Sequence, residues 1–530
     1  MTQVEFVDAE SLALRIEDGQ TVLTVGMTLC GASETVLAAI ESRFLTSGHP
    51  RNLTLIHCAG QSDRQGGIQH LAHEGLVRRI IGSHWGLAPQ WMDFIAHDVV
   101  EAYCLPQGQM THWLRSLASG LNGHLTPIGL GTFIDPQQGG GKMNTRTLPA
   151  PDLVHRVTVQ NDEYLWIDAV PIDWAVIRGT RADTRGNISA EEEAMKLELL
   201  PAVLAARRFS GHVVAQVKEI VPRGALNPRL VEVPGAHVSF VVQVEDVARD
   251  HRQTSGWTYD PSYSQLGWNP SLETMAVKPL DVRRVIGRRA IMELTPGDMI
   301  NLGTGIPNDV IGAEVLREGV ADAVTVTVES GVYGGNPTGG VNFGIAKYPD
   351  ALIEHPYQFD FYNGRGVDVT FMGFGEADVQ GHVNATKLAS LATGAGGFID
   401  ITQKARKVIF CGTFTAQGLR VQVDQGHPHI VQEGQVRKFV SQVQQISFNG
   451  QRAMGQGQEV MIVTERAVLV LTPTGWELRE IAPGIDWNRD VLSQMAFVPR
   501  VAEPLRRMDP QIFREALLGL REHMNLSREA

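Results

Sequence analysis

The chain has 530 residues, 43% of them hydrophobic, which corresponds to two or three domains with packed cores. Its 46 basic and 58 acidic residues give a formal net charge of −12 and are mixed along the chain. A dedicated nucleic-acid binder needs a basic surface against phosphates, so the composition argues against that class of partner. No stretch approaches the ~18 consecutive apolar residues of a membrane-spanning helix, and we expect a soluble, cytoplasmic protein with no membrane partner.

The cysteine and histidine patterns indicate neither a disulfide framework nor a metal site. The four cysteines are scattered along the chain, at Cys30, Cys58, Cys104 and Cys411. This usage is typical of a reducing compartment. His70, His73 and Glu74 stand in the order His-x-x-His-Glu, whereas zinc proteases carry His-Glu-x-x-His. We therefore expect no metal.

Strands and helices are predicted to alternate, which favours an α/β fold with largely parallel sheets covered by helices. Predicted strands are Thr21–Val25, Val213–Val217, Val238–Val242 and Val324–Val328. Predicted helices are Ser33–Arg43, Ala190–Arg207 and Asn308–Glu318, and Leu280–Leu294 is expected to begin the second half. Ser189 and Glu192 have the spacing of a capping box at the start of the second helix. The neighbouring Glu191–Glu193 are interpreted as its solvated first turn.

An internal repeat divides the chain into two similar halves. Ala182–Ala190 resembles Ala377–Ala385, and a basic pair and a β-branched run follow both segments. Asp18-Gly19 and Pro296-Gly297 each lead into a strand, a glycine loop and a helix. We predict two similar open-sheet α/β domains at residues 1–250 and 280–530, joined by a linker at 251–279. The active site is expected in the cleft between them.

Glu329 is the main candidate for chemistry because it ends the strand Val324–Val328 and precedes a glycine-rich turn. Ligands of open α/β sheets gather at the carboxyl ends of strands. A carboxylate placed there can act as a base or as a nucleophile. Taken alone, the pattern also fits a surface or salt-bridge residue.

Two glycine loops in the second half are candidate ligand sites. Gly303, Thr304, Gly305, Ile306 and Pro307 form a loop that opens a helix, where free N–H groups could hold a phosphate or the arm of a cofactor. The loop lacks the third glycine of a dinucleotide fingerprint, and an ordinary tight turn explains its spacing equally well. The cluster Gly394–Gly397 could donate N–H groups to an oxyanion or could simply let a helix pack closely.

Together these motifs resemble the family I coenzyme A transferases over residues 5–520. The segments that show this resemblance are Asp18-Gly19 with the glycine loop Gly26–Gly31, Asn301–Pro307, Val328–Gly331 and Gly394–Phe398. The chain is most similar to the acetate/propionate branch, which acts on short-chain acyl-CoA. That similarity is carried by Thr132–Pro136 running into Gly139–Asn144, by Gly186–Ser189 with Glu191–Glu193, and by Gly397–Gln403.

The resemblance implies a fold shared with sugar-phosphate isomerases and a ping-pong reaction through a glutamyl-CoA thioester on Glu329. It implies that Gly396, Gly397 and Asn384 bind the oxyanion or CoA, and that the Gly303–Pro307 loop binds CoA. It implies acyl-CoA and short-chain carboxylates such as acetate as substrates, no cofactor beyond CoA, and a homo-oligomer, either dimer or tetramer.

Several alternatives stay open at this point. An acyl-CoA hydrolase on the same scaffold would use the same glutamate and differ only in water access. A 3-oxoacid CoA-transferase would differ in its acid, and a ligand-sensing or assembly protein would keep the fold without the chemistry. The first half departs from the family pattern at two places. The family carries Gly-Gly-Phe where this chain has Val25-Gly26-Met27, and Gly-x-Pro where it has Gly31-Ala32-Ser33. These differences leave the acyl preference open.

Overall fold

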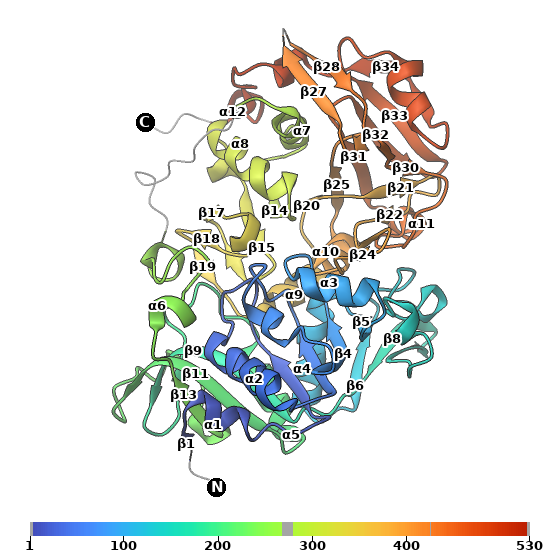
Figure 1. The fold of residues 1–530 in the computed structure, drawn as a ribbon. Coiled ribbons are helices and arrows are strands. Elements are labelled where there is room, and N and C mark those ends of the chain that lie inside the picture. Colours follow the sequence, from blue (N-terminus) through green and yellow to red (C-terminus); the bar gives the residue numbers. More distant parts are fainter. Residues whose placement is uncertain (1–3, 268–278, 425, 527–530) are drawn as a thin grey trace.

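The computed structural model describes residues 4–267, 279–424 and 426–526, and each half of the chain builds one large sheet (Figure 1). The blue-to-green first half lies at the bottom of Figure 1 and the yellow-to-red second half at the top. Helices lie on the sheets and along the boundary between the two halves. This arrangement confirms the predicted α/β fold class. Residues 268–278 of the predicted linker lie outside the described part of the chain.

The first sheet has ten strands, and its main path pairs only parallel neighbours. In sheet order the strands are β1 (Glu5–Phe6), β13 (Phe240–Gln243), β11 (His212–Val221), β9 (Trp174–Asp183), β2 (Thr21–Thr24), β3 (Leu53–His57), β4 (Val77–Gly82) and β5 (Glu101–Cys104). The short strand β10 (Ile188–Ser189) pairs antiparallel with β9, and β12 (Val231–Val233) pairs antiparallel with β10.

The second sheet also has ten strands, with a parallel centre and mostly antiparallel edges. In sheet order they are β19 (Ala351–Leu352), β16 (Val332–Tyr333), β15 (Thr325–Val328), β14 (Met299–Leu302), β20 (Val369–Met372), β25 (Lys407–Cys411), β31 (Glu459–Val463), β32 (Ala467–Thr472), β33 (Gly475–Ile481) and β34 (Arg500–Arg507).

The two halves repeat one strand order, which confirms the internal repeat. The parallel series β3-β2-β9-β11-β13 in the first sheet corresponds to β15-β14-β20-β25-β31 in the second. In each series the strand that comes earliest in the chain, β2 or β14, lies between its two successors in the series: β3 and β9 in the first sheet, β15 and β20 in the second. Such an order brings the carboxyl ends of the central strands to one edge of each sheet, where ligands bind.

The repeated sequence segment forms the same turn in both halves. Asp183 accepts the backbone N–H of Asn187 at 3.0 Å, and Asp378 accepts that of His382 at 3.0 Å. Gly186 and Gly381 complete these turns with φ of +79° and +85°, a region that glycine adopts without strain. The matching residues in the sequence therefore reflect matching local geometry.

Helices pack beside both sheets. Those of the described residues are α1 (Ala9–Ala13), α2 (Glu34–Ser47), α3 (Pro89–Ala96), α4 (Gln107–Ala118), α5 (Leu199–Arg208), α6 (Val247–Asp250), α7 (Val282–Ile291), α8 (Gly312–Arg317), α9 (His355–Asn363), α10 (Phe398–Lys404), α11 (Gly450–Gly455) and α12 (Leu520–His523). A π-helical turn, Pro307–Ile311, leads directly into α8, so the predicted helix Asn308–Glu318 is made of two segments.

The predicted helix start at Ser189 is wrong. Ser189 belongs to β10 and pairs with β9, and α5 begins only at Leu199. The segment between them carries the three glutamates, whose carboxylates form ion pairs with the basic residues of neighbouring strands. The pairs are Glu191–Arg181, Glu192–Lys218 and Glu193–Arg178. These tertiary contacts outweigh the local capping signal.

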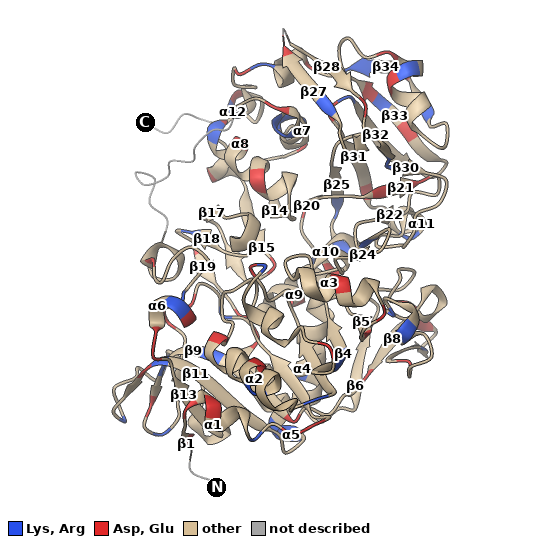
Figure 2. Ribbon diagram, viewed as in Figure 1, with Lys and Arg blue, Asp and Glu red and all other residues tan. Residues whose placement is uncertain are grey.

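Acidic and basic residues are interspersed over both halves (Figure 2). The view shows no segregation of one sign onto one half, in keeping with the mixed sequence. Among the described residues, no helix combines the length and the apolar character that crossing a membrane requires.

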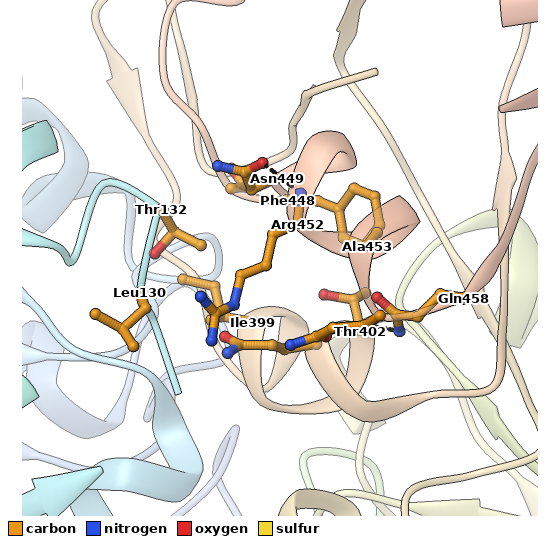
Figure 3. A pocket seen from close by; sticks show the side chains of 12 residues that line it. Leu130, Thr132, Ile399, Thr402, Phe448, Asn449, Arg452, Ala453 and Gln458 are labelled. Carbon is orange, nitrogen blue, oxygen red and sulfur yellow. Dashed lines mark hydrogen bonds between the residues drawn. The ribbon is translucent and has the colours of Figure 1, made fainter. Parts of the chain in front are cut away.

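The two halves contact each other through buried polar groups. Asp400 of α10 accepts the backbone N–H of Gly108 at 3.0 Å and the Gln109 amide at 2.6 Å, both from α4. A small cavity of about 10 Å³ lies nearby between Leu130 of the first half and α10 and α11 of the second half. Figure 3 shows the Arg452 side chain extending toward Leu130 there. A space of this size holds about one water molecule, so it is not a substrate site.

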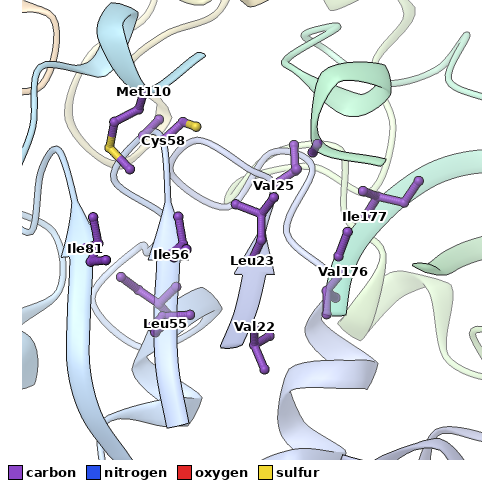
Figure 4. Packing of buried hydrophobic residues seen from close by; sticks show 14 of the residues in the cluster. Val22, Leu23, Val25, Leu55, Ile56, Cys58, Ile81, Met110, Val176 and Ile177 are labelled. Carbon is purple, nitrogen blue, oxygen red and sulfur yellow. The ribbon is translucent and has the colours of Figure 1, made fainter. Parts of the chain in front are cut away.

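The core of the first half lies between the parallel sheet and its helices. Figure 4 shows apolar side chains of β2, β3, β4 and β9 gathered along neighbouring strands. Every residue of β2 is buried, as expected for a parallel strand covered on both faces. The second half has a separate core of buried side chains. Each half therefore supplies its own rigid support for the strand ends.

Candidate active site

Glu329 is the first residue of the tight turn that connects β15 to β16. Val328 pairs with Val332 across the hairpin, and the Gly331 N–H donates to the Val328 carbonyl at 3.0 Å. Gly331 has φ of +104°, and a Cβ there would lie 2.1 Å from the Ile353 carbonyl oxygen. This position therefore requires glycine, and the turn holds Glu329 at the carboxyl end of a sheet strand.

The Glu329 carboxyl group is buried without a hydrogen-bond partner for one of its oxygens. The residue is 7% exposed, and its Oε2 has no partner among the described residues. Burial raises its pKa from the usual 4.5 to about 7. Buried polar groups are normally satisfied, and a shifted acid in a cleft is typical of a functional site. Such a carboxylate can act as a nucleophile or as a general base.

Glu329 lines a cavity of about 520 Å³ whose wall is built by both halves. The wall follows the carboxyl ends of the central strands in both sheets. The first half contributes Met27 and Thr28 after β2, Gly60 after β3, His84, Gly86 and Leu87 after β4, and Gln107 after β5. The second half contributes, among others, the loop after β14, Glu329 after β15, and Met372 and Gly373 at the end of β20. Two equivalent sheet edges therefore enclose one cavity.

The structure brings only part of the predicted CoA-binding loop to this cavity. Gly303, Thr304 and Gly305 line the wall. Ile306 and Pro307 are not part of it, because they begin the π-helical turn that precedes α8. The loop thus presents its backbone to the cavity and its last residues to the helix.

The predicted oxyanion donors Gly396 and Gly397 both line the cavity but differ in their hydrogen bonds. The Gly396 N–H donates to the Ser83 carbonyl at 2.9 Å, so it is already used in joining the two halves. Among the described residues, the Gly397 N–H donates to no acceptor. A Cβ at Gly397 would lie 3.5 Å from the Cβ of Glu329, so Gly397 packs against the Glu329 side chain.

Asn384, the third predicted binding residue, does not reach the cavity wall. Its amide nitrogen donates to Glu376 at 2.8 Å and to the Lys387 carbonyl at 2.6 Å. Its Oδ1 accepts the Thr386 N–H at 3.1 Å. Both ends of the amide are therefore occupied, and the structure places Asn384 in the support of the adjacent turn.

Sequence reasoning missed several polar residues of the cavity wall, among them His84, Gln107 and Asn301. His84 Nδ1 accepts the Gly86 N–H at 3.3 Å, and burial lowers the pKa of His84 to about 4. The ring is therefore neutral near pH 7, with its proton on Nε2. His84 and Gln107 closely follow β4 and β5, so the strand-end rule that identified Glu329 would have found them. The charged residues within those strands hid the strand pattern.

The cavity wall carries little charge. Its ionisable side chains are Glu329, His84 and Asp309, and no lysine or arginine lines it among the described residues. Asp309 already pairs with Arg283 at 2.6 Å. In the described part of the chain, no group of three or more His, Cys, Asp or Glu side chains is arranged to hold a metal ion. His70 and His73 instead both bind Glu41, at 2.6 Å each.

Known proteins match this chain along almost its whole length. A family model described as coenzyme A transferase matches residues 8–244. Caffeate CoA-transferase of Acetobacterium woodii is 39% identical over 97% of this chain and 98% of its own length. Acetate CoA-transferase YdiF of Escherichia coli O157:H7 is 37% identical over 98% of this chain and 96% of its own length.

Solved structures agree with the sequence matches. The YdiF acyl-CoA transferase of Escherichia coli O157:H7 has been solved as the apoenzyme and as a thioester complex with CoA. Each structure is 36% identical, covers 98% of this chain and 97% of its own, and gives a TM-score of 0.89. With a shared fold and near-complete coverage, the chain belongs to the coenzyme A transferase family and is a CoA-transferase.

Proposed function

We propose that this enzyme transfers CoA from a short-chain acyl-CoA to a monocarboxylic acid such as acetate, with Glu329 as the nucleophile. The observation that carries the proposal is the buried carboxylate of Glu329, held at a strand end with an unpartnered oxygen in a cavity shared by both halves. A structural salt-bridge residue would have a cationic partner. A nucleophile needs a free oxygen instead.

In the first half-reaction, a Glu329 oxygen attacks the thioester carbonyl and the CoA thiolate leaves, which forms an acyl-glutamyl anhydride. The thiolate then attacks the glutamyl carbonyl of the anhydride, which releases the product carboxylate and leaves a glutamyl-CoA thioester. An incoming carboxylate reverses both steps and departs as the new acyl-CoA. Water must be kept from the anhydride, which suits an enclosed cavity rather than an open surface.

Each attack places negative charge on a carbonyl oxygen. Gly397 packs against Glu329 and its N–H has no acceptor among the described residues, so we assign it as the backbone donor for this oxygen. A donor of this kind contributes roughly 3–4 kcal/mol to transition-state stabilisation in other enzymes. The Gly303–Gly305 backbone lines another part of the same cavity and suits the CoA arm.

The charge of the cavity supports monocarboxylic acids as the substrate class. A second carboxylate on the acyl chain would lack a cationic partner in the described wall, and an unpaired buried charge costs several kcal/mol. Two relatives are named for caffeate and acetate, and both are monocarboxylates. A YdiF structure is described as a thioester complex with CoA.

The covalent intermediate provides the direct test. Acyl-CoA alone should increase the mass of the intact protein by bound CoA, with the label on the peptide that contains Glu329 and removable by borohydride. Glu329→Gln and Glu329→Ala should show no label and no transfer. In Glu329→Asp the rate of CoA transfer should fall about 100-fold or more, because the shorter side chain misplaces the attacking oxygen by about 1 Å.

Glu459→Gln is the matched control, because it makes the same chemical change at the opposite, amino end of a strand in the same sheet. Its side chain is 61% exposed and pairs with Lys407. Normal labelling is expected in this variant. A Glu329→Gln enzyme that still transfers CoA would overturn the assignment of the nucleophile.

Acceptor dependence separates the transferase from a hydrolase. Initial rates should follow a ping-pong pattern, because the first acid leaves before the second binds. Acetate, propionate and butyrate should discharge the labelled enzyme, while malonate and succinate should do so at least 10-fold more slowly. Equal release of free CoA with and without an acid would identify a hydrolase instead.

A further inference from the structure

A buried chain of three side chains crosses between the two halves behind the reaction cavity. Glu198 Oε2 lies 2.6 Å from His355 Nδ1, and His355 Nε2 lies 2.8 Å from Gln107 Nε2. Glu198 and His355 have fully buried side chains, and Gln107 is 2% exposed. Of the three, only Gln107 belongs to the cavity wall. The other two lie behind it.

Each member of this chain is fixed at the start of a helix. Gln107 begins α4, Glu198 is the N-cap of α5, and His355 begins α9. The Gln107 N–H donates to the Gly396 carbonyl at 3.0 Å, and the His355 N–H donates to the Leu197 carbonyl at 3.1 Å. Backbone bonds between the halves therefore set the positions of the side chains before any ligand binds.

The hydrogen bonds determine where the protons lie. A carboxylate only accepts, so Glu198 requires a proton on His355 Nδ1. The NH₂ group of the Gln107 amide faces His355 Nε2 and can only donate, so Nε2 accepts this hydrogen bond through its lone pair. The amide oxygen is left for the other side. This Oε1 lies 3.6 Å from the position that a Cβ would take at Gly396, in the cavity wall.

We propose that Glu198 and His355 are positioning residues, which hold the Gln107 amide with its carbonyl oxygen toward the bound acyl-CoA. The inference rests on the proposed CoA transfer. A thioester with a simple acyl chain contains no N–H or O–H donor of its own. The nearest donor in the substrate is the first amide N–H of the CoA arm. The Gln107 oxygen would accept a hydrogen bond from this N–H group.

A contact with the CoA arm has a defined kinetic signature. The arm enters from solution in the first half-reaction, so losing the contact lowers kcat/KM for acyl-CoA. In the second half-reaction the arm is already attached to the enzyme, and the contact is the same in the ground state and the transition state. Uniform binding of this kind leaves kcat/KM for the acid unchanged.

The proton positions can be tested without substrate. Protein with ¹⁵N-labelled histidine rings should show His355 as a neutral ring protonated at Nδ1, with its signals assigned by their loss in His355→Gln. A ring protonated at Nε2, or at both nitrogens, would overturn the proposal. This result does not depend on catalysis, so it stands whether or not Glu329 is labelled by CoA.

A mutant cycle tests the positioning role. Glu198→Met with His355→Phe removes both polar groups together, so no buried charge is left unpaired. This double variant and Gln107→Ala should each lower kcat/KM for acyl-CoA by about 10-fold, the effect of one hydrogen bond. The triple variant should have the same kcat/KM for acyl-CoA as Gln107→Ala, because all three substitutions remove the same contact with the CoA arm.

The alternative is that the pair only joins the two halves. In that case the double variant would lose thermal stability, and its effect on kcat/KM would be absent or would add to that of Gln107→Ala. Either result would overturn the proposal. A fall in kcat/KM for the acid equal to that for acyl-CoA would overturn the assignment of the contact to the CoA arm.

Discussion

The backbone of Gly397 lies directly against the side chain of Glu329. A Cβ at position 397 would be 3.5 Å from the Glu329 Cβ, 3.3 Å from Phe359 Cζ and 3.2 Å from Ile401 Cδ1. The backbone there has φ of −81° and ψ of 0°, which any residue can adopt. A side chain at this position would therefore disturb the packing around the carboxylate and not the backbone.

Gly397→Ala should accordingly reduce kcat/KM by at least 10-fold while costing about 1–3 kcal/mol of stability. The added methyl displaces Glu329 and crowds the neighbouring N–H. Initial rates and thermal unfolding together measure the two effects. Gly455→Ala is the control, because a Cβ at that helical glycine meets nothing within 4 Å. Wild-type kinetics in Gly397→Ala would contradict the proposed arrangement.

The rate of the first half-reaction should follow the ionisation of Glu329. The attacking form is the carboxylate, and its pKa is raised to about 7 by burial. kcat/KM for acyl-CoA should therefore rise about 10-fold per pH unit below 7 and level off above it. His84, with its pKa lowered to about 4, adds no step in this range. A profile that falls between pH 6 and 8 would exclude an ionised nucleophile.

Glu329 should destabilise the folded enzyme at alkaline pH. Its pKa is about 7 when folded against 4.5 for an ordinary glutamate, so the folded state binds more protons between these values. Its contribution to the free energy of unfolding therefore falls as pH rises from 4.5 to 7. At pH 8, Glu329→Gln should be more stable by up to about 3 kcal/mol, and below pH 4.5 the gain should vanish. Thermal unfolding of both proteins across this range measures the difference, and a constant difference would refute it.

The paired aspartates of the repeat should contribute similarly to their two halves. Asp183 accepts the N–H groups of Arg185 and Asn187, and Asp378 accepts those of Gln380 and His382. Alanine at either aspartate leaves these donors without their partner and should cost about 1–3 kcal/mol. Replacing either aspartate with asparagine keeps an acceptor oxygen and should lower the free energy of unfolding by less. Equal melting temperatures for the Asp→Ala variants and the wild type would show that the turns form without these bonds.

Local sequence was sufficient for the features that depend on neighbouring residues. The β-branched runs predicted β2 and β15 within one residue, because a run of β-branched side chains bounded by glycine or charged residues is a local signal. The matching Asp-x-x-Gly turns revealed the repeat, and strand-end position selected Glu329. The helix start at Ser189 was wrong because Arg178, Arg181 and Lys218 bind the glutamates from strands that only the folded sheet brings near.

The tertiary structure decided what surrounds Glu329. Strand order brings the carboxyl ends of two sheets together, so His84 and Gln107 share a cavity with a glutamate more than 200 positions away in the chain. It also decided which polar groups are free: the Gly396 N–H is taken by Ser83, while the Gly397 N–H remains. Burial then raises the pKa of Glu329. The sequence by itself determined the residue types and their strand-end positions, because these follow from local propensity. Burial and hydrogen-bond occupancy depend on contacts between distant segments, and only the fold establishes them.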